Sequence, residues 1–424
     1  MAKHSMKRFI VILAAACVLW PCRAQQTSTE VFRAALEAQG VTFTNNNSIV
    51  LLHNGRDKFN AMFDAIRSAR RYVYLEYFNF RNDSIGLALF DLLGQKAQEG
   101  VEVRAMFDSF GNKSNDSPLQ KHHLKAIRAT GVDVREFDPM CFPWINHVYH
   151  RDHRKIVIID GEVCFTGGMN VADYYIHGRP EYGAWRDMHM QLTGDAVARY
   201  EEIFRTMWKS AFDVQLAEHE PASFDSPSYL TLLTDTSATA SHKCVGVVDR
   251  TPGRHSKDMR KAYCAAIDAA QKHIQIVNPY PVNVKSVRRA LRRALKRGVR
   301  LEIMVSSRSD VPVTPDIVGL EMKKLASRGA EVYYNNEGFH HSKIMMVDSA
   351  YCTVGSTNMD ARSFLFDYEV NSFILDSATT GELQSIFEKD KLNCTLFTAK
   401  DWRKRFNLGH RITGRLFSLL RGFF

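Results

Sequence analysis

Two stretches of the chain carry the same polar residues in the same order and at the same spacing. Each reads His-x-Lys-x4-Asp, with a glycine seven positions and an asparagine ten positions after the aspartate. The residues are His153, Lys155, Asp160, Gly167 and Asn170 in the first stretch, and His341, Lys343, Asp348, Gly355 and Asn358 in the second. Side chains alternate along an extended strand, so the histidine and lysine of each stretch point to one face. Each stretch can therefore present an imidazole, an ammonium and an amide together.

Two such sets that face each other would suit a phosphate group. The two imidazoles would lie on opposite sides of phosphorus, with the lysines and asparagines around its oxygens. In-line displacement requires this arrangement, because the attacking and leaving oxygens are opposed while negative charge sits on the equatorial oxygens. The residue types and spacing thus predict an enzyme that transfers phosphodiester groups.

The doubled motif resembles the HKD signature of the phospholipase D superfamily. Its flanking strings are similar to bacterial cardiolipin synthase; they cover Tyr149–Lys155, Gly167–Tyr175, Trp185–Asp187, Val354–Phe364 and Glu369–Asn371. The resemblance implies that one histidine attacks phosphorus to give a phosphohistidine, while the other protonates the departing alcohol and activates the incoming one. It favours His153 as the nucleophile and His341 as the acid and base, and the near symmetry of the two halves leaves the reverse assignment open.

The same resemblance assigns the remaining motif residues. Four of them would hold the phosphate: Lys155, Lys343, Asn170 and Asn358. The aspartates at the far end of each strand, Asp160 and Asp348, are expected to be structural. Neither a metal nor a cofactor is implied.

A nucleophilic histidine also needs an acceptor for its second ring nitrogen. In the second half Glu369, 28 residues after His341, matches the orienting glutamate of the family. In the first half Glu181 has the same spacing, but the context of Asp187 fits the family better. We therefore expect Asp187 to be the acceptor there; the alternative is a surface salt bridge between Asp187 and Arg186.

The two motifs belong to an internal duplication. A helical segment, a glycine and an apolar strand-like run recur around Gly100 and Gly298, and again around Gly131 and Gly329, both pairs 198 residues apart. Helices alternating with strands predict an α/β fold of two homologous lobes, each a mixed β-sheet flanked by helices, with the active site at their interface. Ten extra residues precede His153. This insertion, apolar around Met140–Ile145, is either a lip that touches lipid or an ordinary buried loop.

We divide the chain into five parts. Residues 1–24 have the basic, apolar and small-residue order of a signal peptide or short anchor. The first lobe is expected over 25–221, a linker rich in Ser, Thr, Asp and Pro over 222–243, and the second lobe over 244–398. A basic, apolar tail over 399–424 could seat on a membrane or pack on the second lobe.

Three smaller predictions concern charge and burial. The net charge of +10 favours polyanionic partners, either nucleic acid or anionic lipid headgroups, and does not distinguish between them. Lys285–Arg297 is expected to form a helix with a buried apolar stripe and a basic outer face, which is either solvated or in contact with anionic lipid. Cys164 and Cys352 are expected to be buried thiols.

The resemblance implies that two phosphatidylglycerols are joined into cardiolipin with release of glycerol. The expected partners are phosphatidylglycerol and an anionic membrane surface, with no nucleic acid and no obligate protein partner. The signal-like segment predicts export to the periplasmic face of the bacterial cell membrane, where the chain would be peripheral or anchored by its N-terminal segment. An exported phospholipase D-type hydrolase, which would use water as acceptor, and an exported nuclease are the alternatives. A lipid-binding protein without catalysis would not require both histidines.

Overall fold

A computed structural model describes residues 26–140, 148–219, 242–253, 255–282 and 284–418. The predicted signal or anchor, most of the insertion before His153, most of the linker and the last six residues of the tail lie outside these ranges.

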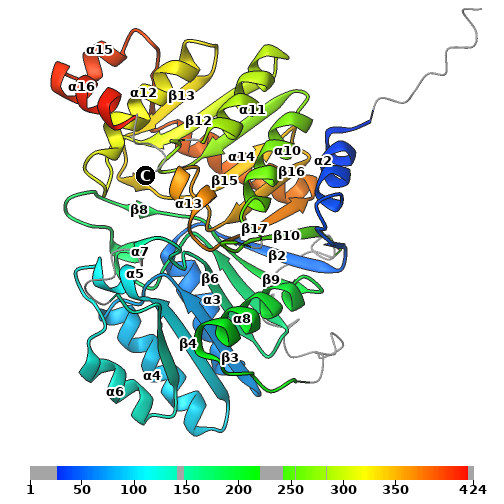
Figure 1. Cartoon of the computed structure of the whole chain (residues 1–424), viewed down its shortest axis with the longest axis vertical. Coiled ribbons are helices and arrows are strands. Elements are labelled where there is room, and N and C mark those ends of the chain that lie inside the picture. Colours follow the sequence, from blue (N-terminus) through cyan, green and yellow to red (C-terminus); the bar gives the residue numbers. More distant parts are fainter. Residues whose placement is uncertain (1–25, 141–147, 220–241, 254, 283, 419–424) are drawn as a thin grey trace, which may run out of the picture.

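The first lobe is built on a mixed sheet (Figure 1). Its strands are β2 (Asn47–Leu52), β3 (Tyr72–Tyr77), β4 (Glu102–Asp108), β5 (Asp133–Phe137), β6 (Lys155–Ile159), β7 (Val163–Gly167) and β9 (His189–Gly194). Its helices are α3 (Gly55–Ser68), α4 (Ser84–Gln98), α5 (Ser109–Lys113), α6 (Lys121–Ala129), α7 (Tyr174–His177) and α8 (Val197–Phe212). The strand order is β2-β9-β7-β6-β3-β4-β5, with β3, β4 and β5 parallel and the other pairs antiparallel.

The second lobe contains a nine-stranded sheet. Its strands are β1 (Phe43–Thr44), β10 (Cys244–Arg250), β11 (His273–Val277), β12 (Arg300–Ser306), β13 (Glu331–Asn335), β15 (Ile344–Val347), β16 (Tyr351–Gly355), β17 (Glu369–Leu375) and β18 (Cys394–Phe397). Its helices are α2 (Ser28–Glu37), α10 (Asp258–Ala269), α11 (Lys285–Lys296), α12 (Thr314–Ala326), α13 (Ala361–Leu365), α14 (Ser377–Lys391), α15 (Trp402–Arg405) and α16 (Leu408–Phe417). The strand order is β1-β10-β17-β16-β15-β11-β12-β13-β18.

The duplication read from the sequence is a duplication of sheets. The run β10-β17-β16-β15-β11-β12-β13 repeats the first sheet in order and direction, with β11, β12 and β13 parallel. Gly100 after α4 and Gly298 after α11 have φ of +93° and +84°. This left-handed conformation suits glycine and ends each helix before the next strand. The predicted α/β class with two homologous lobes is confirmed.

The N-terminal segment corrects one predicted boundary. Although α2 and β1 precede the first lobe in sequence, β1 pairs with β10 and α2 packs on α10. Phe32 and Leu36 of α2 are fully buried in the core of the second lobe, and the Phe32 ring stacks on Tyr351 with centroids 4.5 Å apart. Burial of this apolar face places the segment in the second lobe, so the first lobe begins at β2 rather than at residue 25.

The two lobes share a hydrophobic core. Apolar side chains of β6 and β15, the strands inside the two repeated motifs, belong to one cluster together with residues of α8 and α14. The Tyr200 hydroxyl on α8 lies 2.7 Å from the Ser372 hydroxyl on β17. A short parallel pair, β8 (Trp185–Arg186) with β14 (Phe339–His340), also crosses between the lobes. The lobes are therefore held in a fixed relation by packing and by main-chain hydrogen bonds.

Other predicted features take simple positions. Val287, Ala290, Leu291 and Ala294 form the buried stripe of α11. Cys164 and Cys352 are buried thiols that form no disulfide, and they lie in equivalent strands. None of the helices in the described ranges is long and apolar enough to cross a bilayer.

Candidate active site

The two histidines are held by the main chain of the opposite lobe. His153 directly precedes β6, and its backbone N–H donates to the carbonyl oxygen of Tyr368 at 3.1 Å. His341 lies just before β15, and its N–H donates to the carbonyl oxygen of Arg186 at 2.6 Å. The lobes thus exchange equivalent contacts across their interface, which brings the two motifs together as the sequence predicts.

The carboxylate partners are crossed in the same way. Nδ1 of His153 lies 3.0 Å from Oε1 of Glu369, a residue of the second half. Nδ1 of His341 lies 2.7 Å from Oδ2 of Asp187, a residue of the first half. Each acceptor directly follows the residue whose carbonyl holds that histidine's backbone. For these two motif pairs, neither lobe supplies both the histidine and its carboxylate.

Strand register shows that the two acceptors are equivalent. Gly167 is paired with His189 and Gly355 with Asn371, and each acceptor lies two residues before that partner. Glu181, the alternative with matching sequence spacing, is exposed in a turn. Arg186 forms an ion pair of 2.6 Å with Asp390, so it does not supply the surface salt bridge considered for Asp187.

The residue in contact with each acceptor carboxylate differs between the two halves, being Gly168 in the first and Ser356 in the second. A Cβ atom on Gly168 would lie 2.2 Å from Oδ1 of Asp187, so only glycine leaves room for that carboxylate. The equivalent residue, Ser356, instead donates its hydroxyl to Oε2 of Glu369. The Gly-Gly and Gly-Ser variants of the motif therefore fit an aspartate and a glutamate, respectively.

Burial and the two lysines set the charge states of the histidines. Burial, and then the charges of Lys155 and Lys343, hold the pKa of His153 well below its ordinary value. Burial and Lys343 also lower the pKa of His341, and Asp187 offsets part of this effect. Burial opposes ionisation of Asp187, but Lys343 and His341 outweigh it, so the pKa of that carboxyl lies below its usual range.

The lysines lie against the motifs that carry them. Nζ of Lys155 donates to the carbonyl oxygen of His153 at 2.5 Å, and burial lowers the pKa of Lys155 to about 7. Nζ of Lys343 donates to the carbonyl oxygen of His341 at 2.5 Å and lies 3.1 Å from Nε2 of the same ring. Lys343, which is also 2.8 Å from Nδ1, therefore lies directly against the ring of His341, and Lys155 lies against the main chain of His153.

The two asparagines have unused hydrogen-bonding capacity. Asn170 follows β7 and Asn358 follows β16, and they are only 5% and 7% exposed. Their Oδ1 atoms are buried and have no hydrogen-bond partner within the described part of the chain. A buried polar group without a partner is costly unless a ligand or water completes it. Both amides are thus placed to meet a bound polar group.

Aromatic rings surround the histidines, and sequence reasoning did not single them out. The ring of Phe78 meets His153 edge-on, with centroids 5.1 Å apart. The centroids of Trp185, Phe339 and Tyr280 lie 5.7, 5.4 and 6.1 Å from that of His341. Phe78 and Tyr280 follow equivalent parallel strands, β3 and β11, at the edge where ligands bind in open α/β sheets. The equivalence of β3 and β11 in the internal repeat is the signal that could have pointed to Phe78 and Tyr280 from the sequence.

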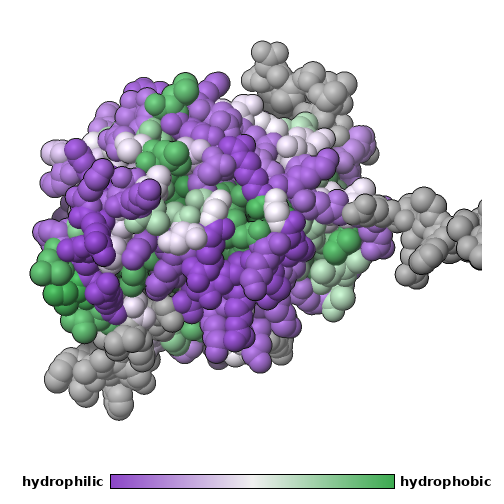
Figure 2. All heavy atoms as spheres, turned by 90° about the horizontal axis from the view of Figure 1, so that it is seen from above, coloured by the Kyte–Doolittle hydropathy of each residue, from purple (hydrophilic) through white to green (hydrophobic). Residues whose placement is uncertain are grey.

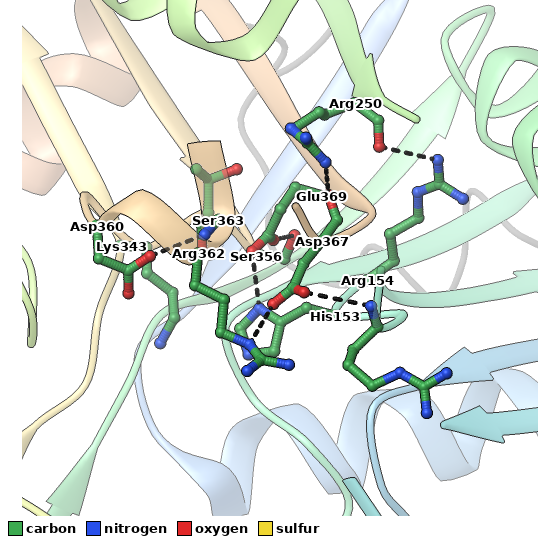
Figure 3. A network of polar contacts seen from close by, with 12 residues as sticks. His153, Arg154, Arg250, Lys343, Ser356, Asp360, Arg362, Ser363, Asp367 and Glu369 are labelled. Carbon is green, nitrogen blue, oxygen red and sulfur yellow. Dashed lines mark hydrogen bonds and ion pairs between the residues drawn. The ribbon is translucent and has the colours of Figure 1, made fainter. Parts of the chain in front are cut away.

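A second feature missed from sequence is a polar network that includes Arg154 and Arg250 (Figure 3). Arg154 is 1% exposed and reaches Glu76 of its own lobe at 3.3 Å, Asp249 of β10, and the Thr251 hydroxyl at 3.0 Å. Arg250, next in that strand, donates to the carbonyl oxygen of Asp367, two residues before Glu369. The residue between His153 and Lys155 thus ties the first motif to the segment that carries its carboxylate.

The motif aspartates lie at the opposite end of their strands. The carboxylate of Asp160 accepts three backbone N–H groups, from Arg70, Arg71 and Tyr72, each at 2.8 Å. Asp348 accepts the equivalent three groups, from Gln271, Lys272 and His273, also at 2.8 Å. Both aspartates have φ near +54° and fix the start of the neighbouring strand. These contacts are with the scaffold and not with the site.

Comparison with known proteins gives a consistent result. The sequence model described as "Cardiolipin synthase, PLD-like domain" matches residues 62–208 and 263–391. A probable cardiolipin synthase of Bacillus subtilis is 33% identical over 360 residues, which cover 85% of this chain and 69% of that protein. The major cardiolipin synthase of Bacillus subtilis is 33% identical over 364 residues, 86% of this chain and 73% of its own. The crystal structure of phosphatidylserine synthase from Haemophilus influenzae superposes with a TM-score of 0.72 at 14% identity, covers 93% of this chain and 100% of that one, and shares the fold.

Proposed function

The chain belongs to the PLD-like cardiolipin synthase family, and on that premise we propose that it transfers a phosphatidyl group from one phosphatidylglycerol to another. The products are cardiolipin and glycerol. The observation that supports the proposal is the pair of crossed histidine–carboxylate contacts, made by two imidazoles from equivalent segments of the two lobes.

In the first step Nε2 of His153 attacks phosphorus while Nδ1–H donates to Glu369. The bond between phosphorus and the glycerol oxygen breaks, and that oxygen leaves with a proton from His341. The low pKa of His153 keeps its ring neutral, as a nucleophile requires. Ionised Asp187 stabilises the protonated ring of His341, and the negative phosphodiester favours that form further.

In the second step the hydroxyl of another phosphatidylglycerol gives its proton to His341 and attacks phosphorus. The phosphorus–nitrogen bond breaks, and its electron pair returns to His153. Lys155, Lys343, Asn170 and Asn358 hold the phosphoryl oxygens in both steps. One phosphodiester replaces another, so the exchange needs no other source of energy.

The setting of the reaction is part of the same proposal. The substrate is a bilayer lipid, so the protein works at an anionic membrane surface. We propose the periplasmic face of the bacterial cell membrane, reached through the signal-like segment over 1–24. The net charge of +10 supports attraction to anionic headgroups.

Product analysis tests the reaction. Purified protein is incubated with phosphatidylglycerol in mixed micelles, beside the His341→Ala variant, and the lipids are identified by mass spectrometry. Cardiolipin and glycerol, absent with the variant, are expected. Phosphatidic acid alone would mean that water is the acceptor and that the protein is a hydrolase. No lipid product would refute the proposal and direct attention to nucleic acid, whose cleavage should fall steeply with salt.

A further inference from the structure

The C-terminal helix α16 presents an apolar stripe to solvent. Leu408, Ile412 and Leu416 are four residues apart and therefore lie on one face, with exposed fractions of 65%, 47% and 58%. The opposite face packs on α12, where Gly414 lies against the backbone of Asp316. The helix is thus seated on the second lobe, and its outer stripe is exposed within the part of the chain that the structure describes.

The same segment is strongly cationic. Between Trp402 and Ser418 the chain carries five Lys or Arg residues and no Asp or Glu. Four of the five are exposed: Arg403, Lys404, Arg405 and Arg415. The Trp402 ring lies beneath Arg411 and Arg415, whose guanidinium carbons are 5.8 and 5.7 Å from its centroid. These contacts hold positive charge beside the apolar stripe.

This surface is connected to the catalytic site through one loop. Nδ1 of His410 on α16 lies 2.9 Å from Oδ1 of Asp316 at the start of α12. The loop before α12 carries Asp310, which accepts the hydroxyl of Tyr280, and the Tyr280 ring borders His341. Figure 1 places α15 and α16 on the same side of the molecule as β8 and α7. Figure 2 shows apolar patches, one of them at the left edge, set in a largely hydrophilic surface.

We propose that the surface formed by α15 and α16 docks this protein on an anionic phospholipid bilayer. An apolar stripe flanked by arginines and lysines is the pattern of helices that lie in the membrane interface, where cations meet headgroups and apolar side chains enter the acyl boundary. A symmetric contact with a second copy would instead oppose the same cations to one another. The inference rests on the proposed function because a lipid substrate gives the protein a reason to dock.

Vesicle binding tests the docking surface. The full chain is floated with vesicles of phosphatidylglycerol and phosphatidylcholine at several salt concentrations. The triple variant Leu408→Ser, Ile412→Ser, Leu416→Ser should bind at least about tenfold more weakly. The matched control Leu87→Ser, Leu392→Ser removes side chains that are 54% and 85% exposed elsewhere, and should change binding less than about twofold.

A double variant that removes two positive charges provides a second test, which still applies if the triple variant unfolds α16. Arg403→Gln with Arg415→Gln should weaken binding to phosphatidylglycerol vesicles about tenfold. Arg289→Gln with Lys296→Gln on α11, also exposed, should leave binding near that of the unaltered protein. Equal binding by the unaltered protein and the α16 variants would overturn the proposal. An equal loss of vesicle binding in the control variants would also overturn it. So would a conversion of a dimer into a monomer in the α16 variants without any change in vesicle binding.

Activity on short-chain phosphatidylglycerol, dissolved as monomers, separates this inference from the proposed function. The α16 variants should keep that activity while losing activity on vesicles. If the unaltered protein binds vesicles through α16 but yields no cardiolipin from either substrate, the proposed function fails and the docking surface stands.

Discussion

Replacement of Asp187 by Asn should disable the histidine of the other half of the chain. The carboxylate of Asp187 lies 2.7 Å from Nδ1 of His341 and is 1% exposed. Two opposite charges about 4 Å apart interact by about 4 kcal/mol at an effective dielectric constant of about 20. Asn keeps the shape and loses the charge, so the protonated form of His341 should lose about 3–4 kcal/mol of stabilisation. Since about 1.4 kcal/mol is tenfold in rate, turnover should fall about 10²- to 10³-fold.

The assay uses a phosphatidyl ester of a nitrophenol, whose leaving group needs no proton. In the Asp187→Asn variant His153 can still attack this ester, but activation of the incoming alcohol by His341 is impaired. A phosphatidyl adduct should therefore accumulate on the peptide that contains His153, as detected by mass spectrometry after rapid quenching. The Glu369→Gln variant should form little adduct, because the ring of His153 has lost its partner. Glu181→Gln should behave like the unaltered protein.

Two results would refute this reasoning. An adduct on His153 in Glu369→Gln, with none in Asp187→Asn, would mean that each carboxylate serves the histidine of its own half. An adduct on His341 in Glu369→Gln would mean that His341 is the nucleophile, with the crossed pairing retained and the roles exchanged.

Three further predictions concern pH, space and stability. Lys155 has a pKa of about 7, so it is charged below that pH and neutral above it. The value of kcat/KM should therefore fall as pH rises through about 7. Lys155→Arg should remove this alkaline limb from the pH–rate profile. Gly168→Ala places a methyl group 2.2 Å from Asp187 and should lower kcat at least about tenfold with little change in thermal melting; unchanged kcat would show that the carboxylate can move. Asp160→Ala removes an acceptor of three backbone N–H groups at a residue with φ of +53° and should destabilise the fold by about 3–4 kcal/mol. Asp160→Asn should destabilise it by only about 1–2 kcal/mol. Equal denaturation midpoints for the two variants would contradict the role of these hydrogen bonds.

The sequence contained the local part of the site. The alternation of a strand places His153 with Lys155 and His341 with Lys343, because side-chain direction depends only on neighbouring residues. The repeat likewise predicted two similar lobes, since each unit carries its own helix, glycine and strand signals. Asp187 could be preferred over Glu181 from the string around it, and strand register gives the physical reason for that preference.

Only the tertiary structure decided which groups meet. The contact between His341 and Asp187 spans 154 residues and that between His153 and Glu369 spans 216, so no local pattern records that they cross. The crossing follows from how two sheets pack through a common core, which is a property of the assembled lobes. The same holds for α2, whose apolar face could have packed on either lobe, and for the outer stripe of α16. Sequence determined which side chains could do the chemistry, and long-range packing determined their partners. The reason is that which apolar faces become buried depends on how all the helices and sheets pack together.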